Sequence, residues 1–165
     1  MRSLRTESVV AQMSLDELRE LATFGALSDA AISDLLAKGT IWQRDKGDVF
    51  ELKGKVLSGF FVVLSGDIAW YQHCEDRDVM TRHFRKGEQM GFDAMIGMRP
   101  CSGTEVPVEP SLVLEISSDQ FFQFHLDFPA DFGLLMINLS RELSREIAML
   151  EGALGKSTGW QVDGD

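Results

Sequence analysis

The middle of the chain carries the pattern that most constrains its fold. Residues 40–116 consist of short apolar segments that alternate with turn residues, and the most apolar segment is residues 59–64. Glycine, aspartate and serine punctuate this region, for example at residues 45–48, 65–67 and 86–88. Short strands with such a turn roughly every 8–12 residues are typical of jelly rolls and small barrels. The pattern therefore predicts a β-roll of about eight strands.

Helical patterns lie on both sides of this β region. Residues 14–17 have the spacing of a capping box, and Gly39 ends a second predicted helix. On the C-terminal side, Pro129 separates a short helix that begins at Ser118 from a long one. Helices packed beside an antiparallel roll make an α+β fold, which is the fold class we expect.

The length and the apolar content fit one domain with short appendages. A chain of 165 residues with 44% hydrophobic residues can build a core of ordinary size. We expect a flexible arm over residues 1–13, a folded domain over residues 14–155 and a disordered tail over residues 156–165. The expected parts of the folded domain are helices at 14–38, the roll at 40–116 and helices at 118–154.

Charge and hydropathy exclude several classes of function. The net charge of −10 and the isoelectric point near 4.7 argue against a nucleic-acid partner, because phosphates are repelled. The basic cluster at residues 82–86 is interpreted as a solvated strand end. No apolar segment is long enough to span a membrane, and none follows the N-terminus as in a signal peptide. We therefore expect a cytoplasmic protein without a membrane partner.

Cysteines and histidines are placed without the spacing of a functional cluster. Cys74 and Cys101 lie far apart, so free thiols are expected, and the three histidines are scattered. No nucleophile–base pair and no pair of carboxylates stands out in the sequence. We therefore expect neither a metal site nor enzyme activity.

The long C-terminal helix carries a continuous apolar stripe. Its residues recur at intervals of three or four over about five turns, and they are Met136, Leu139, Leu143, Ile147, Leu150 and Leu154. Such a stripe packs on its own domain or on a second copy of the chain, and both interpretations stay open. The partner contacts are expected at Leu139, Leu143, Ile147 and Leu150.

A glycine-rich stretch at residues 91–104 links two β-type segments. Such a stretch can present backbone N–H groups to an anion, because glycine adopts positive φ and lets the backbone approach closely. A plain connecting loop has a similar composition, so the motif by itself is weak.

In their order and spacing, these segments resemble the cyclic nucleotide-binding domain. This is the effector domain of catabolite-activator and Fnr-type regulators, and it also occurs in kinase regulatory subunits and ion channels. The resemblance covers roughly residues 20–155 and is carried by residues 24–28, 46–50, 60–68, 85–91 and 121–129. It implies that residues 91–104 are a phosphate-binding cassette at a helix N-terminus.

The cassette departs from the family at its two binding residues. The family pattern is Gly-Glu-(Leu/Ile)-Ala-Leu, followed by Pro-Arg-(Ser/Ala)-Ala-Thr. Aligned without gaps, the agreeing residues are Gly91, Ala94, Met95, Pro100, Ser102 and Thr104. The family glutamate, which holds the ribose, falls on Phe92, and the arginine that neutralises the phosphate falls on Cys101. Because an arginine–phosphate pair is charge-assisted and often bidentate, its loss predicts a degenerate cassette.

Two questions about the cassette remain open. As an alternative to a degenerate cassette, Asp93 and Arg99 replace the missing pair and, with Ser102 and Thr104, make a non-standard pocket for a cyclic mono- or dinucleotide. The role of Cys101 is also open, because this residue is either a redox-responsive thiol or a small residue that fills the pocket.

The long helix departs from the family as well. The positions that contact adenine in the catabolite activator hold Glu146 and Ile147 here. No helix-turn-helix follows the long helix, so we do not expect a transcription factor. The expectation is a stand-alone, non-catalytic regulatory module without a cofactor, which contacts a signalling protein or forms a homodimer through its C-terminal helix. Cyclic nucleotide is disfavoured as a ligand, and a genuine nucleotide sensor is the alternative.

Overall fold

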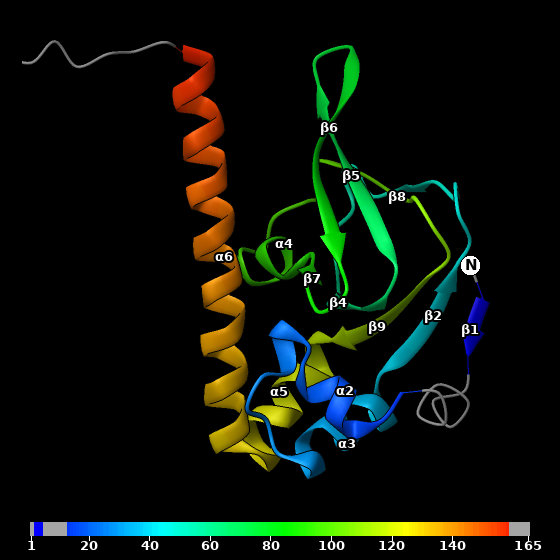
Figure 1. Cartoon of the computed structure of the whole chain (residues 1–165), viewed down its shortest axis with the longest axis vertical. Helices are drawn as coiled ribbons and strands as arrows, with labels where there is room; N and C mark the ends of the chain where they lie inside the picture. The colour runs from blue at the N-terminus through cyan, green and yellow to red at the C-terminus, as the bar shows by residue number, and fades with distance from the viewer. Residues whose placement is uncertain (1, 5–12, 159–165) are drawn as a thin grey trace, which may run out of the picture.

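The computed structural model describes residues 2–4 and 13–158 (Figure 1). Within the predicted flexible arm, Arg2–Leu4 form strand β1, which pairs with the edge of β2. An exposed strand edge offers unpaired backbone groups, and an extended segment can satisfy them. Over these three residues the expected arm is therefore an edge strand, while residues 1 and 5–12 lie outside the described residues.

Two antiparallel sheets make up the β-roll. In the described part of the chain one sheet has the order β1-β2-β9-β4-β7 and the other the order β3-β8-β5-β6. The bounds are β2 (Thr40–Arg44), β3 (Phe50–Glu51), β4 (Gly59–Ser65), β5 (Asp67–Cys74), β6 (Arg77–Arg85), β7 (Gln89–Met90), β8 (Gly103–Pro107) and β9 (Ser111–Ser117). The predicted roll of eight strands is confirmed in β2 to β9.

Helices cover one end and one side of the roll. They are α2 (Leu15–Arg19), the 3-10 helix η1 (Ala22–Phe24), α3 (Asp29–Lys38), α4 (Phe92–Ile96), α5 (Ser118–Asp127) and α6 (Pro129–Thr158). Helices α2, α3 and α5 gather at one end, and α6 stands alongside the roll as a long column (Figure 1). None of the helices in the described residues is long and apolar enough to span a membrane.

Local sequence signals explain where several helices begin and end. Ser14 and Glu17 form the predicted capping box, and the Ser28 side chain accepts a hydrogen bond from the backbone of Ala31. Helix α6 continues to Thr158, so residues 156–158 of the predicted tail are helical. Residues 159–165 lie outside the described residues.

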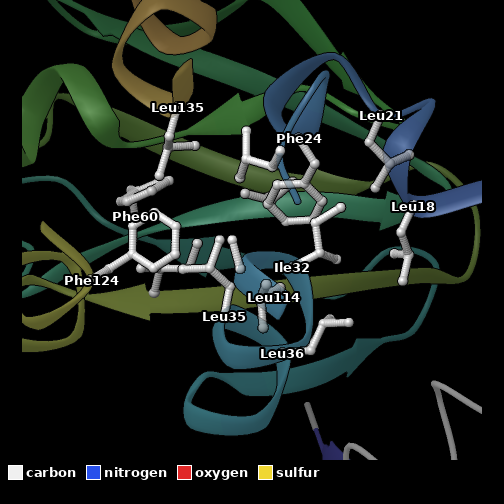
Figure 2. Close-up of a cluster of buried hydrophobic side chains, with 14 of the residues drawn as sticks. Leu18, Leu21, Phe24, Ile32, Leu35, Leu36, Phe60, Leu114, Phe124 and Leu135 are labelled. Atoms are coloured by element: carbon white, nitrogen blue, oxygen red, sulfur yellow. The ribbon is translucent and has the colours of Figure 1, made fainter. Parts of the chain in front are cut away.

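The main core lies between the five-stranded sheet and the helices. Strand β4 contributes Phe60 and β9 contributes Leu114, and these pack against Phe24 of η1 and Leu35 of α3 (Figure 2). Strand β4 is buried on both faces, because Val63 points into a second cluster inside the roll. The most apolar segment of the sequence, residues 59–64, is therefore a largely buried strand, and it pairs with β7, the strand that precedes the cassette.

Candidate functional site

A pocket lies between the cassette, the β5–β6 hairpin and α6. Its volume is about 290 Å³, close to the lower end of small-molecule sites, which begin at roughly 300 Å³. The lining residues from the hairpin are Trp70, Gln72, Thr81, Arg82 and Phe84, and those from α6 are Glu146, Met149 and Leu150. Helix α4 lies between α6 and the hairpin (Figure 1), so all three elements bound the same site.

Six of the eight predicted ligand-binding residues line this pocket, namely Gly91, Asp93, Ala94, Arg99, Cys101 and Ser102. Gly91 caps α4 with a φ of 78°, and a Cβ added there would lie 2.7 Å from Leu57 Cδ1. The left-handed backbone conformation therefore favours glycine, whereas the close contact is with the end of a flexible side chain that could move. Helix α4 is a single turn that turns the chain from β7 towards the pocket mouth.

Phe92 and Thr104, the other two predicted residues, do not line the pocket. Phe92 is 2% exposed and packs edge-on against Phe60, with ring centroids 5.3 Å apart. Thr104 lies in the β8 ladder opposite Tyr71. The gapless alignment placed Phe92 at the ribose position, whereas the turn of α4 directs it into the core and places Asp93 at the pocket.

The charged cassette residues pair with each other at the pocket mouth. Arg99 donates to Asp93 across 3.1 Å, and both side chains are at least half exposed. Ser102 donates through Oγ to Gln72 Oε1 across 3.1 Å. Asp93, Arg99 and Ser102 are therefore brought to one site, and the Arg99 charge is already matched by a carboxylate.

Cys101 is a buried thiol. Burial raises its pKa, and the carboxylates of Asp93 and Glu105 raise it further. The thiolate is the reactive form of cysteine, so a raised pKa lowers the reactivity of this thiol near neutral pH. These surroundings favour the interpretation of Cys101 as a pocket-filling residue. Both cysteines are free, as predicted.

Arg82 is a pocket residue that the sequence analysis missed. Arg82 pairs with Trp70 across the β5–β6 ladder and Met80 pairs with Tyr71, so Thr81 between them is an extra, bulged residue. Neighbouring strand residues normally face opposite sides, and a bulge changes this alternation. As a result Thr81 and Arg82 both line the pocket.

The guanidinium group of Arg82 has two neighbours. It stacks 4.4 Å from the centroid of the Phe84 ring, and it forms an ion pair with Glu146 of α6. The Arg82 side chain is 11% exposed, which corrects the expectation of a solvated strand end at this residue, whereas Arg85 and Lys86 of the same cluster are exposed. No signal in the sequence marks this role, because β6 holds three arginines and does not alternate apolar and polar residues.

A buried carboxyl group fastens the middle of α6 to the roll. Glu142 accepts hydrogen bonds from Thr23 Oγ1 and from the backbone N–H of Gln89, each across 2.9 Å. Burial raises the pKa of Glu142. One turn earlier, Asn138 Nδ2 donates to the carbonyl groups of Thr23 and Gly25. Neither anchor residue was expected from the sequence, because both are polar residues that lie beside the apolar stripe.

Helix α6 has a buried half and an exposed half. Leu139 is fully buried in the core of its own domain, and Leu143 is half-buried beside it. Ile147 and Leu150 are 57% and 56% exposed, and Leu154 continues this exposed face. Among the four predicted partner residues, Leu139 is therefore covered by its own chain, and Ile147 and Leu150 are available to a partner.

Sequence comparison identifies the fold family that has this architecture. The family model of the cyclic nucleotide-binding domain matches residues 43–127, which is more than half of the chain. The chain belongs to the cyclic nucleotide-binding domain family. The matched range contains the cassette, the β5–β6 hairpin and Arg82. No curated protein matches the chain in sequence.

Solved structures share the cyclic nucleotide-binding domain fold at low sequence identity. A cyclic nucleotide-binding domain from Methylobacillus flagellatus KT has a TM-score of 0.77 and 18% identity, over 90% of this chain and 86% of its own. The catabolite activator protein of Thermus thermophilus has a TM-score of 0.69 and 17% identity, over 83% of this chain and 63% of its own. The sensor domain of the regulator DNR from Pseudomonas aeruginosa has a TM-score of 0.63 and 21% identity, over 88% and 95%. The chain thus spans less than two thirds of the catabolite activator.

Proposed function

We propose that this chain is a non-catalytic regulatory domain that acts through protein contacts and whose pocket has lost the affinity of the fold for cyclic nucleotides. The observation that carries the proposal is the charge balance of the pocket. Arg82 and Arg99 are its two lining arginines in the described residues, and each already pairs with a carboxylate, Glu146 or Asp93.

A cyclic phosphate is an anion, and burying it requires a cation that is free to pair with it. In this pocket a phosphate would have to displace a carboxylate from an arginine and would also approach Glu105, a third acidic lining residue. Cys101 supplies no positive charge, and burial keeps its thiol protonated because it raises the pKa. These groups weigh against a cyclic nucleotide as the ligand.

The exposed half of α6 supports a function in protein contacts. Ile147, Leu150 and Leu154 place three large apolar side chains in solvent on one helix. Contiguous exposed apolar surface of this kind marks interaction sites. A second copy of the chain is the partner we propose, because the stripe keeps a spacing of three and four residues that suits pairing of like helices.

Isothermal titration calorimetry with cyclic AMP and cyclic GMP tests the loss of the ligand. We expect no heat of binding at micromolar concentrations of the protein and the nucleotide. A micromolar dissociation constant for either nucleotide contradicts the proposal. The variant Asp93→Asn frees Arg99 from its partner, so its titration shows whether an unpaired Arg99 gives weak nucleotide binding at the pocket mouth.

The second candidate function is a nucleotide sensor with a non-standard pocket. The observation in its favour is that a pocket of about 290 Å³ remains and that Asp93, Arg99 and Ser102 share it. Thermal shift measurements over a panel of cyclic mono- and dinucleotides distinguish the two candidates. A rise in melting temperature that Arg99→Gln abolishes supports the sensor.

A further inference from the structure

The less exposed of the two arginines in the pocket stands in an apolar wall. Arg82 is nearly buried, whereas Arg99 at the mouth is 64% exposed. The neighbouring apolar lining residues are Leu52, Leu57, Trp70, Phe84, Met90 and Leu150. Ligand pockets commonly combine such a wall with a small number of polar groups that orient the ligand.

We propose that this pocket binds a small organic acid with an apolar body, whose carboxylate pairs with Arg82 in place of Glu146. The structure itself presents a carboxylate to Arg82, since Glu146 reaches into the pocket from α6. The guanidinium fork matches a carboxylate well, and the Phe84 ring beneath it keeps the group in place.

The geometry of Arg82 leaves room for a better partner than Glu146. Its Nη1 atom is buried and, among the described residues, makes no hydrogen bond with acceptable angles, although it lies close to Glu146 Oε2. A ligand carboxylate is not tethered to a helix, so it can align with the guanidinium plane. A buried donor without a hydrogen bond is costly, and alignment recovers that cost.

The pocket suits a small acid with one negative charge better than a cyclic nucleotide, because both must displace a carboxylate from an arginine but only the apolar body of the acid matches the apolar wall. Glu105 and Asp93 also line the site, and because each already holds an arginine, the pocket offers no second free cation to a ligand with several negative charges. Glu105 is neutralised by Arg44 and Asp93 by Arg99, so a single negative charge at Arg82 leaves the other pairs intact. An apolar body of modest size then fills about 290 Å³.

Binding at Arg82 has a consequence for α6. The Arg82–Glu146 ion pair joins the β5–β6 hairpin to the part of α6 that follows the Glu142 anchor. A ligand that takes Arg82 releases Glu146, which is partly exposed and can turn to solvent. The exposed half of α6 then loses its side-chain tie to the roll. This consequence rests on the proposed function, because it assumes that α6 makes the protein contacts.

Titration with simple acids and their amides tests the proposal. Benzoate and hexanoate are compared with benzamide and hexanamide, which keep the apolar body and lack the charge. Binding is followed by calorimetry and by tryptophan fluorescence, to which Trp70 of the pocket wall contributes. We expect at least one acid to bind. Its amide should bind at least about tenfold more weakly, since charge-assisted hydrogen bonds are the stronger class.

Two substitutions separate Arg82 from the rest of the pocket. Glu146→Gln removes the internal competitor, so it should tighten acid binding by about tenfold. Arg82→Gln should weaken it by about tenfold or more. Glu151→Gln changes an exposed residue of the same helix and should change nothing. If Arg82→Gln fails to fold, as judged by circular dichroism, the acid–amide comparison and Glu146→Gln still decide.

Three outcomes overturn the proposal: neither acid binds Glu146→Gln at about 10 mM, the amides bind as well as the acids, or a folded Arg82→Gln keeps full affinity. Hydrogen exchange in residues 144–154 tests the coupling and should become faster when the acid is bound. If cyclic AMP binds instead, the proposed function fails in its own titration, so the two failures are distinguishable.

Discussion

At the scale of single residues, the hydroxyl group of Thr23 has one proton and two acceptors. Thr23 Oγ1 lies 2.8 Å from the carbonyl oxygen of Gly87 and 2.9 Å from Glu142 Oε1. An ionised Glu142 and Gly87 compete for the one Thr23 proton, whereas a protonated Glu142 would donate to Thr23 and leave the Thr23 proton to Gly87. The charged groups nearest Glu142 are Glu88, which raises its pKa further, and Arg145, which opposes the shift.

This cluster predicts a pH-dependent stability. The pKa of Glu142 is raised in the folded state, so its contribution is complete below the unfolded value near 4.5 and is lost as pH rises through the folded pKa. Glu142→Gln mimics the protonated form, and we expect urea denaturation to show a flatter pH dependence and a higher stability near neutral pH. Glu151→Gln is the matched control. An unchanged pH profile in Glu142→Gln contradicts this assignment.

A second residue-scale prediction concerns Phe92. Phe92→Glu restores the family residue in the gapless alignment, but the side chain lies in the core against Phe60. Loss of the ring and burial of a charge should lower the free energy of unfolding by about 3–5 kcal/mol. Calorimetric titration should show no gain of cyclic AMP binding. Asp93→Glu, at the exposed neighbouring position, should cost less than about 1 kcal/mol; a gain of binding in Phe92→Glu would show that the side chain reaches the pocket.

At the scale of elements, α6 is divided by its anchors. Asn138 and Glu142 tie the first half to η1 and β7, and the apolar side chains beyond them are uncovered. The same helix therefore packs on its own roll and offers a surface for a partner. The stripe in the sequence is continuous. The polar anchors beside it mark where the helix changes from packing on its own roll to exposing apolar side chains.

The proposed dimer predicts a defined effect of substitutions on α6. Ile147→Asp combined with Leu150→Asp should convert the dimer to a monomer, because two charges replace apolar contacts, and sedimentation velocity measures the change. Leu126→Asp alters an equally exposed apolar residue on α5 and should leave the dimer intact. A wild-type monomer at high concentration, or a dimer that survives the double substitution, contradicts the proposed contact.

At the scale of the whole molecule, a buried ion pair joins the two sheets. Arg44 of β2 pairs with Glu105 of β8, and its guanidinium group lies 4.4 Å from the Phe50 ring centroid and 5.0 Å from that of Phe61. Both charged side chains are almost fully buried. Such a pair fixes how the sheets meet, because either charge is costly without the other.

Breaking this pair should destabilise the roll strongly. Glu105→Leu or Arg44→Met alone should lower the free energy of unfolding by about 3–5 kcal/mol, because one buried charge is left unpaired. The double variant Arg44→Met with Glu105→Leu should recover much of that loss. Urea denaturation of the four proteins gives the coupling energy. Additive losses in the double variant would show that the charges do not interact.

The sequence by itself determined the fold class and most element boundaries. Periodicity is a local property, so the turns at residues 45–48 and 86–88, the capping box at residues 14–17 and the break at Pro129 could all be located from it. Gly91 could be located for a similar reason, because its positive φ is a backbone requirement. The pairing of β1 and the length of α6 at its end were not predicted.

Only the tertiary structure decided which side chains make the site. One turn of helix sends Phe92 to the core and Asp93 to the pocket, and one bulged residue brings Arg82 beside Glu146, which lies 64 positions away along the chain. Such contacts depend on side-chain direction and on strand register, and neither leaves a periodic trace in the sequence. The cassette is recognisable from its glycines, whereas its charge balance exists only in the folded chain.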